Sequence, residues 1–404
     1  MKIVVLKFGG TSVGTIEKIK KVAKIIGDYK KNRYKVIVVS SAMSGVTNEL
    51  IKKSNQLSEN FSETEYDVLV SSGEQVACSL IAGRLNHNGL KSRSWLGWQI
   101  PIITNGPNKN SRIQQINKKK IIDYLKKGGI PIIAGFQGVN NNERITTIGR
   151  GGSDASAIMI AKFFKAQRCI IYTDVEGIYT TDPNKLKTAK KIKVISYEEM
   201  LEMASLGAKV MQPVSIQDAR LNRIDIEVKS SFKKKSGTLI TKKSHILNNR
   251  IITGISSTQN DAKVTLIGVK DRPGVAASIF KPLSEKMVNV DMVVQNISAN
   301  GKETDLTFTI KREYLNKTKK IIKGNKNINF RKLILNKGVS KISVIGVGMI
   351  TTPGVTFRMF QALANKKINI QVISTSEIKI SVLIDKKDTK KGLLALHSEF
   401  KLDK

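Results

Sequence analysis

Hydrophobic residues in the first 230 positions form short β-branched runs that alternate with longer amphipathic stretches. Predicted strands are Ile3 to Leu6, Lys35 to Ser40, Pro131 to Ala134 and Cys169 to Asp174. An amphipathic helix is predicted where apolar residues recur at helical spacing, at Ile16, Ile19, Val22, Ile26 and Tyr29. Helices are also predicted for Ile113 to Lys127 and Asp154 to Lys165. This alternation predicts an α/β fold with a mainly parallel sheet, whose ligands bind at the carboxyl ends of the strands.

The pattern changes after a basic, serine-rich stretch, 233–248, which we interpret as the edge of a strand followed by a linker. Beyond it the chain repeats itself. A strand precedes the Pro273-Gly274 turn, and another precedes the Pro353-Gly354 turn. Each proline is followed at the same interval, 16 residues, by Asn289 or Asn369 and a further strand. The repeat predicts two small α+β modules of the βαββαβ type.

The first polar motif, Lys7-Phe8-Gly9-Gly10-Thr11-Ser12, stands where the first predicted strand turns into a helix. Glycines let a phosphate approach the backbone N–H groups, and Lys7 adds a full positive charge. The motif is neither a Walker A loop nor a dinucleotide fingerprint. The alternative is two glycines in an ordinary turn between a strand and a helix, but the flanking lysine and hydroxyls favour phosphate binding.

A second glycine-rich motif, Gly149-Arg150-Gly151-Gly152-Ser153-Asp154, precedes a predicted helix. Ser153 or Asp154 can cap that helix, and Arg150 can form two hydrogen bonds with a carboxylate or phosphate. The alternative is a capped helix with a surface arginine.

The stretch from Tyr172 to Pro183 leaves a strand end and places Asp174 and Asp182 among hydroxyls and an aromatic ring. This composition suits an adenine or ribose pocket, and a plain polar turn is the alternative.

Two further segments add hydroxyls and one carboxylate, Ser40 to Asn48 and Ser71-Ser72-Gly73-Glu74. Glu74 suits the ammonium group of an amino-acid substrate. Ser196 to Glu199 forms a capping box that opens a helix, and Lys209 follows the end of that helix. The three histidines lie outside all these segments, which fits a phosphoryl acceptor that is already ionised, such as a carboxylate.

The composition of the chain bears on its location and on the kinds of partner it binds. The 404 residues lack an apolar run of about 18 and a signal-peptide pattern, and the two cysteines give neither a disulfide framework nor a metal cluster. We therefore expect a cytoplasmic protein without a membrane partner. The net charge of +37 raises nucleic-acid binding as an alternative. The lysines are dispersed and aromatic residues make up only 5%, so we interpret the charge as a solvated basic surface.

Taken together, these motifs closely resemble the aspartate kinases of the amino-acid kinase family, with Gly135-Phe136-Gln137-Gly138 and Thr180-Thr181-Asp182-Pro183 as further matches. The C-terminal repeats resemble ACT domains, which bind amino-acid effectors. The resemblance implies a three-layer αβα kinase domain over 1–245 and ACT domains over 263–337 and 338–404. Residues 246–262 would form a linker and a strand, Ile251 to Ser257, shared with the second ACT domain.

The resemblance also implies the reaction, in which ATP and L-aspartate give ADP and 4-phospho-L-aspartate, and the role of each site residue. Lys7, Asp154 and Lys209 would be catalytic. The nucleotide would contact Lys7, Phe8, Gly9, Gly10, Ser41, Thr173, Asp174, Tyr179, Asp182 and Lys209. Aspartate would contact Thr47, Glu74, Phe136, Arg150, Gly151 and Ser153. Mg²⁺ would be held through ATP oxygens, with no protein ligand.

For the ACT pair, the resemblance implies that lysine, threonine or both bind and inhibit. The effector residues would be Asp271, Gly274, Ala276, Asp291 and Gln295 from the first module, and Val355, Thr356, Asn369, Ile370, Ser376 and Glu377 from the second. A homo-oligomer formed through the ACT domains is expected. Two positions depart from the family pattern: Asn184 stands where arginine is common, and Gln212 where histidine is common.

The rival functions are a kinase for another amino acid or a nucleotide, a non-catalytic amino-acid sensor of the same fold, and a nucleic-acid-binding regulator. The paired ACT modules argue against the first. The intact Lys7, Asp154 and Lys209 argue against a sensor without activity.

Overall fold

The computed structural model describes residues 2–206, 210–242, 251–297, 303–325 and 328–403. These residues group into two compact units. The first contains residues 2–179, 191–205 and 210–242, and the second contains residues 180–190, 206 and 251–403. The excursion 180–190 therefore groups with the C-terminal part of the chain, although it leaves from and returns to the first unit.

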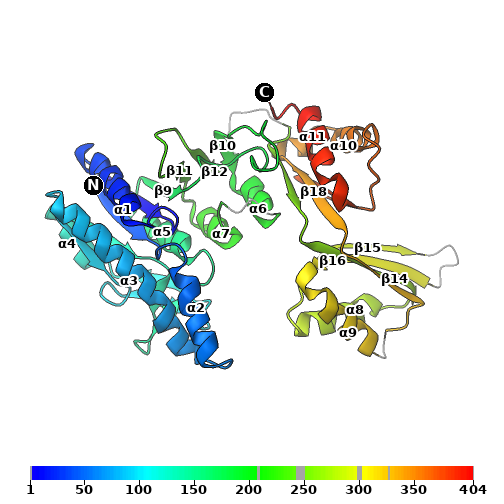
Figure 1. Ribbon diagram of the computed structural model, residues 1–404, viewed down its shortest axis with the longest axis horizontal. Coiled ribbons are helices and arrows are strands. Elements are labelled where there is room, and N and C mark those ends of the chain that lie inside the picture. The colour runs from blue at the N-terminus through cyan, green and yellow to red at the C-terminus, as the bar shows by residue number, and fades with distance from the viewer. Residues whose placement is uncertain (1, 207–209, 243–250, 298–302, 326–327, 404) are drawn as a thin grey trace. The chain divides into compact units, whose positions relative to one another are not determined.

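The first unit is built on an eight-stranded sheet with the order β10-β12-β11-β9-β1-β2-β6-β3 (Figure 1). All neighbouring strands are parallel except β11 and β12. The strands are β1 (Ile3–Phe8), β2 (Lys35–Ser40), β3 (Ser92–Trp95), β6 (Ile130–Ala134), β9 (Arg168–Thr173), β10 (Val194–Ser196), β11 (Ile226–Ser230) and β12 (Thr238–Thr241). The mainly parallel sheet predicted from the alternation is confirmed.

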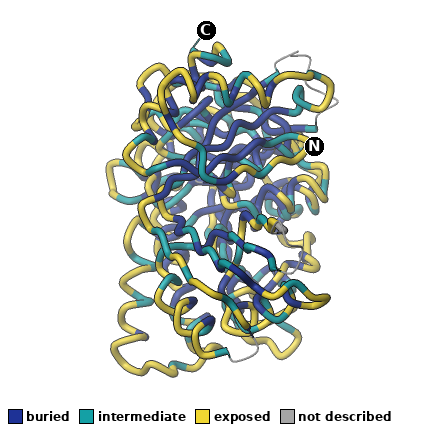
Figure 2. Tube along the Cα trace, turned by 90° about the vertical axis from the view of Figure 1, so that its right-hand side faces the viewer, coloured by how far each residue is buried: buried dark blue, intermediate teal, exposed yellow. Residues whose placement is uncertain are grey.

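Helices cover this sheet because its strands present apolar side chains to both faces. Helices α1 (Ile16–Lys31) and α3 (Glu63–His87) share one core with β1, β2 and β6, to which Leu6, Val22 and Ile81 belong. Helix α5 (Gly152–Phe163) contacts β1, β9 and β2 and packs beside α7 (Pro213–Asn222). In Figure 2, where the trace is coloured by burial, strands are mostly buried and the outer turns of helices are exposed. The remaining helices are α2 (Val46–Leu57), α4 (Lys119–Lys126) and α6 (Tyr197–Ser205).

Three sequence expectations need correction in this unit. Ile113 to Lys127 is not one helix, because Arg112–Ile116 forms strand β5 and the helix α4 begins only at Lys119. β5 belongs to a separate four-stranded sheet with β4 (Ile102–Asn105), β7 (Gln137–Val139) and β8 (Ile145–Thr147), so pairing with β4 overrides the local helical spacing. Ile16 is 53% exposed at the start of α1. The strand expected within the basic stretch 233–248 is β12, but it pairs with β10 on one side and β11 on the other and so does not lie at the edge of the sheet.

The second unit contains two α+β modules, each with a four-stranded antiparallel sheet. One has the strand order β15-β16-β14-β17 and the other β13-β18-β20-β19. The first module comprises β14 (Asp261–Lys270), α8 (Val275–Glu285), β15 (Val290–Ile297), β16 (Glu303–Lys311), α9 (Leu315–Gly324) and β17 (Lys332–Asn336). The second comprises β18 (Val339–Ile345), α10 (Val355–Ala364), β19 (Val372–Ser376), β20 (Lys379–Asp385) and α11 (Thr389–Glu399), with β13 (Gly254–Thr258) added.

The strand that precedes the first module thus pairs in the second, as expected from the family resemblance. Gly274 and Gly354 end the two Pro-Gly turns at φ +87° and +86°, a conformation that glycine adopts without strain. The two turns open α8 and α10 in the same way, which explains the repeat in the sequence. No helix among the described residues is long and apolar enough to cross a membrane.

Candidate active site

A buried ion pair between Lys7 and Asp154 forms the centre of the candidate site. Along β1, Val4, Leu6 and Phe8 point into the core shared with α1 and α3. Because side chains alternate along a strand, Lys7 points to the opposite face, where α5 contacts β1. Lys7 Nζ lies 2.5 Å from Asp154 Oδ1 in the first turn of α5, and the two side chains are only 9% and 10% exposed.

The glycine turn after β1 is fixed to the ends of two neighbouring strands. Gly9 N–H donates to the Tyr172 carbonyl at 3.1 Å, and the Ser231 hydroxyl donates to Ser12 Oγ at 2.6 Å. A Cβ at Gly10 would lie 2.9 Å from the Ala42 carbonyl oxygen, so any side chain would displace the next loop. The turn is therefore a rigid, backbone-lined surface beside Lys7, which fits phosphate binding.

Helix α5 begins beside this turn, and its N-cap differs from the prediction. Gly151 is the N-cap at φ +76°, without a side-chain cap, and Ser153 and Asp154 already lie in the first turn. Asp154 is thereby free to pair with Lys7. A Cβ on Gly135 would lie 2.9 Å from Ser153 Cβ, and one on Gly152 would lie 2.8 Å from the Phe136 ring. The glycines thus allow Phe136, Ser153 and the helix N-terminus to approach one another closely.

Glu74 presents a buried carboxylate with one unpartnered oxygen. Its Oε1 accepts a hydrogen bond from Ala42 N–H at 3.0 Å, whereas Oε2 is buried without a partner among the described residues. Burial raises the pKa of Glu74 to about 7, although the hydrogen bond from Ala42 and the charge of Lys7 oppose the increase. A substrate ammonium group would satisfy Oε2 and restore the ionised form.

Most of the residues predicted to bind the nucleotide belong to the first unit. Ser41 N–H donates to the Phe8 carbonyl at 3.1 Å, and Thr173 Oγ1 donates to Asp174 Oδ1 at 3.1 Å at the end of β9. Tyr179 belongs to the same unit, whereas Asp182 lies on the excursion 180–190, where its Oδ1 accepts from Asn184 N–H at 2.9 Å. Lys209 lies outside the described residues.

The predicted substrate residues Thr47 and Arg150 also belong to the first unit. Thr47 lies in the first turn of α2, and Arg150 is exposed immediately before α5. The remaining nearby prediction, the capping box, is confirmed, because Ser196 N–H donates to Glu199 Oε2 at 3.1 Å and Glu199 N–H donates to Ser196 Oγ at 3.2 Å.

One structural carboxylate was missed by the sequence reasoning. Asp67 is fully buried in α3 and accepts hydrogen bonds from Thr147 Oγ1 at 2.5 Å and from Lys109 N–H at 3.1 Å. It therefore holds the 106–111 loop and the end of β8, directly before the Gly149-Arg150 segment. A single carboxyl group between Tyr66 and the apolar run Val68–Val70 was the available signal.

In the second unit, the predicted effector residue Asp291 is already paired with an internal cation. Lys341 of β18 forms ion pairs with Asp291 and, at 3.6 Å, with Asp261 Oδ2, and its side chain is only 4% exposed. Met292, Val339, Val372 and Leu383 form a small apolar cluster between the modules. The seam between the modules therefore combines apolar contact with a charge network around the buried Lys341.

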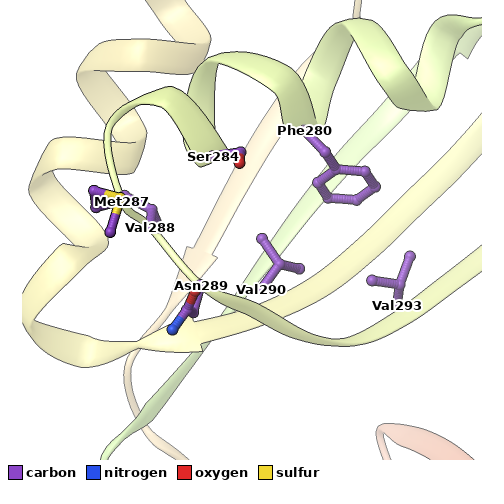
Figure 3. A pocket seen from close by; sticks show the side chains of 7 residues that line it. All are labelled: Phe280, Ser284, Met287, Val288, Asn289, Val290 and Val293. Carbon is purple, nitrogen blue, oxygen red and sulfur yellow. The ribbon is translucent and has the colours of Figure 1, made fainter. Parts of the chain in front are cut away.

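The other predicted effector residues lie at the starts of helices and along or beside the strands that follow them in the two modules. Asp271, Gly274 and Ala276 surround the start of α8, and Val355 and Thr356 open α10. Gln295 lies in β15, Asn369 and Ile370 precede β19, and Ser376 and Glu377 lie where β19 turns into β20. A separate cavity of about 350 Å³ lies between α8 and β15, with Phe280 and Ser284 on the helix and Val290 and Val293 on the strand (Figure 3).

Comparison with known proteins agrees with this geometry. The sequence profile of the amino acid kinase family matches residues 2–230, and the ACT domain profile matches 264–325 and 342–400. The aspartokinase of Pseudomonas aeruginosa is 45% identical over 406 residues, which cover 100% of this chain and 98% of the relative.

Solved structures give the same result. Aspartokinase III of E. coli in complex with aspartate and ADP (R-state) is 25% identical, with a TM-score of 0.78, and the match covers 98% of this chain and 99% of that one. The same enzyme in complex with lysine and aspartate (T-state) is 25% identical, with a TM-score of 0.80, and the match covers 99% and 100%.

Proposed function

The chain belongs to the aspartate kinase family, and from that premise we propose that it transfers the γ-phosphoryl group of ATP to the side-chain carboxylate of L-aspartate. The products are ADP and 4-phospho-L-aspartate, at the entry to lysine, threonine and methionine biosynthesis. The relative in complex with aspartate and ADP supports the choice of substrates. Because the reaction consumes ATP, we place the enzyme in the cytoplasm.

The observation that carries this proposal is the buried Lys7–Asp154 pair beside the glycine turn, with Lys7 close enough to the Glu74 carboxylate for its charge to lower the pKa of Glu74. The Lys7 ammonium group neutralises charge on the transferring phosphoryl group, while the N–H group of Gly10 binds its oxygens. Gly9 N–H already donates to the Tyr172 carbonyl, so Gly9 contributes by letting the phosphate approach the turn closely. Asp154 holds Lys7 in place. Lys209 supplies a second positive charge. The acceptor carboxylate is ionised at neutral pH, so catalysis needs no general base.

L-Aspartate is held at both of its α-substituents. Its ammonium group binds the unpartnered Oε2 of Glu74, and its α-carboxylate binds the exposed Arg150 guanidinium. Thr47, Phe136, Gly151 and Ser153 complete the aspartate site, and the N-terminus of α5 favours the negative charge of the bound substrate.

In addition to Lys7, Gly10 and Lys209, the nucleotide contacts Phe8, Ser41, Thr173, Asp174 and Tyr179, all of the first unit. Mg²⁺ would be held chiefly through the phosphate oxygens of ATP and water, where it would neutralise phosphate charge. Asn184 replaces an arginine common in the family, so this chain makes one fewer cationic contact at that position.

The ACT pair makes the activity sensitive to amino acids. Lysine, threonine or both bind at the predicted effector residues and stabilise a less active arrangement, and the ACT domains join copies of the chain into a homo-oligomer. The relative in complex with lysine supports a lysine effector. We propose kinase and ACT domains at 1–245, 263–337 and 338–404, with 246–262 as linker and shared strand.

A coupled assay of ADP release tests the reaction directly. L-Aspartate should support turnover, whereas L-glutamate, with one more methylene, and succinate, which lacks the ammonium group, should support little. Lys7→Ala should reduce turnover by at least a hundredfold, about the loss seen when one charge-stabilising donor is removed from an active site. Lys2→Ala, five residues earlier and exposed, is the matched control. Equal rates with aspartate and glutamate would reject the proposed substrate.

A further inference from the structure

Both tryptophans of the chain line one cavity, at the edge of the eight-stranded sheet farthest from β10. The cavity has a volume of about 630 Å³ and lies between β3, the turn that follows it and α4. We call it the tryptophan pocket and define it by Arg93, Trp95, Trp98, Lys120, Tyr124 and Lys127. Its volume lies in the range of pockets that hold small molecules.

Aromatic rings form the walls of the tryptophan pocket. The Trp95 and Tyr124 rings meet edge to face at 5.9 Å, and the Arg93 guanidinium lies 4.1 Å from the centre of the Trp95 ring. These contacts hold Trp95 rigidly. Trp98, in contrast, is 52% exposed, and it offers a planar apolar surface on which a ring can stack.

The tryptophan pocket also contains an unmet hydrogen-bond donor. Trp95 is 5% exposed, and its Nε1–H is buried without a partner in the part of the chain that the structure describes. An indole N–H can only donate, so the missing partner is an acceptor. Leaving such a donor buried and unpaired is unfavourable, so an acceptor on a bound ligand would gain from it.

The charged residues of the tryptophan pocket indicate the charge of its ligand. Arg93, Lys120 and Lys127 line the tryptophan pocket, against the single carboxylate of Asp123. Lys120 Nζ donates to the Gln99 carbonyl at 3.0 Å, which leaves Arg93 and Lys127 as the cations for a ligand. A second copy of this chain docked face to face would bring these cations together across a twofold axis, which is unfavourable. The occupant is therefore a separate anion.

We propose that the tryptophan pocket binds a small planar anion, an aromatic ring that carries a carboxylate or a phosphate. The ring stacks on Trp98, an acceptor atom receives the Trp95 N–H, and the anionic group lies between Arg93 and Lys127. The site is distinct from the catalytic centre, because β2 and β6 separate β3 from β1 in the sheet. This proposal does not depend on which substrate the enzyme phosphorylates.

Intrinsic fluorescence tests the proposal on the intact protein, since every tryptophan of the chain lines this pocket. Adenosine monophosphate and benzoate serve as separate probes for the phosphate and carboxylate forms, with excitation at the red edge of the indole band, where neither absorbs. We expect saturable quenching by at least one probe, and the probe that quenches identifies the anionic group. Nucleotide bound at the catalytic centre would not contact a tryptophan.

Two variants make the result specific. Trp98→Ala should weaken binding about tenfold, as expected for the loss of one stacking surface, with Trp95 still reporting. Lys127→Gln should weaken binding, whereas Lys126→Gln, an adjacent exposed lysine outside the pocket, should not. The absence of saturable quenching by both probes would overturn the proposal. So would affinities unchanged in Trp98→Ala, or a monomer–dimer equilibrium in sedimentation that Trp98→Ala abolishes.

Discussion

Replacing Glu74 with glutamine should stabilise the protein at alkaline pH while it weakens aspartate binding. Glu74 is 3% exposed, one carboxylate oxygen accepts from Ala42 N–H, and the other has no partner among the described residues. Burial raises the pKa of Glu74 from an ordinary value of 4.5 to about 7. Glutamine keeps an acceptor for Ala42 N–H and carries no charge, so it removes only the cost of a buried ionised group.

The size and sign of the effect follow from proton binding. Below about pH 4.5 the carboxyl is protonated in both the folded and the unfolded chain, so it has no effect on stability. Between pH 4.5 and about 7 the folded state keeps a proton that the unfolded state loses, so stability falls as the pH rises. Above pH 7 the full penalty is present, about 3 kcal/mol at 1.36 kcal/mol per pKa unit.

Urea unfolding followed by tryptophan fluorescence measures this effect, because Trp95 and Trp98 both belong to the first unit. At about pH 8.5, Glu74→Gln should be more stable than the parent by about 3 kcal/mol, and at about pH 4.5 the two should coincide. Glu59→Gln, which removes an exposed carboxylate, should leave both curves unchanged. A difference that is the same at both pH values would refute the reasoning, because it would not come from ionisation.

Kinetics complete the test. Loss of a charge-assisted contact to the substrate ammonium group should reduce kcat/KM for aspartate by about tenfold to a hundredfold. In the parent, KM for aspartate should rise as the pH falls below about 7, as Glu74 becomes protonated. A pH-independent KM between pH 6 and 8 (about the range around that pKa) would remove Glu74 from aspartate binding.

Three further changes probe other parts of the molecule. Asp154→Asn should leave Lys7 as a buried, poorly compensated cation, and should lower both turnover and, by about 3 kcal/mol, the free energy of urea unfolding. Gly135→Ala should push Ser153 away by its Cβ and raise KM for aspartate more than it lowers kcat, in initial-rate assays. Asp291→Ala should shift lysine inhibition curves at least tenfold without changing uninhibited activity, since Lys341 keeps Asp261 as a partner, and overlapping curves would place the effector elsewhere.

The local features of the site could be predicted from the sequence because they depend on neighbouring residues. The β-branched run before Lys7-Phe8-Gly9-Gly10 gave the strand and the turn after it, and the Pro-Gly repeat gave two modules of the same kind. The N-cap of α5 was predicted wrongly, because Asp154 pairs with Lys7 of β1 instead of the helix end. Local propensity carries no information about that partner, which lies 147 positions earlier in the chain.

The sequence alone determined the alternation of strands and helices around the main sheet, the repeat of the two C-terminal modules, the family and the chemical types of residue available for phosphoryl transfer, since these follow from short-range pattern. Only the tertiary structure decided which charges meet. It buried Glu74 with one free oxygen, paired Asp291 with Lys341, and gathered both tryptophans around one cavity. Burial and ion pairing depend on contacts between distant segments, and the pKa of a carboxyl group depends on those contacts rather than on its neighbours in the chain.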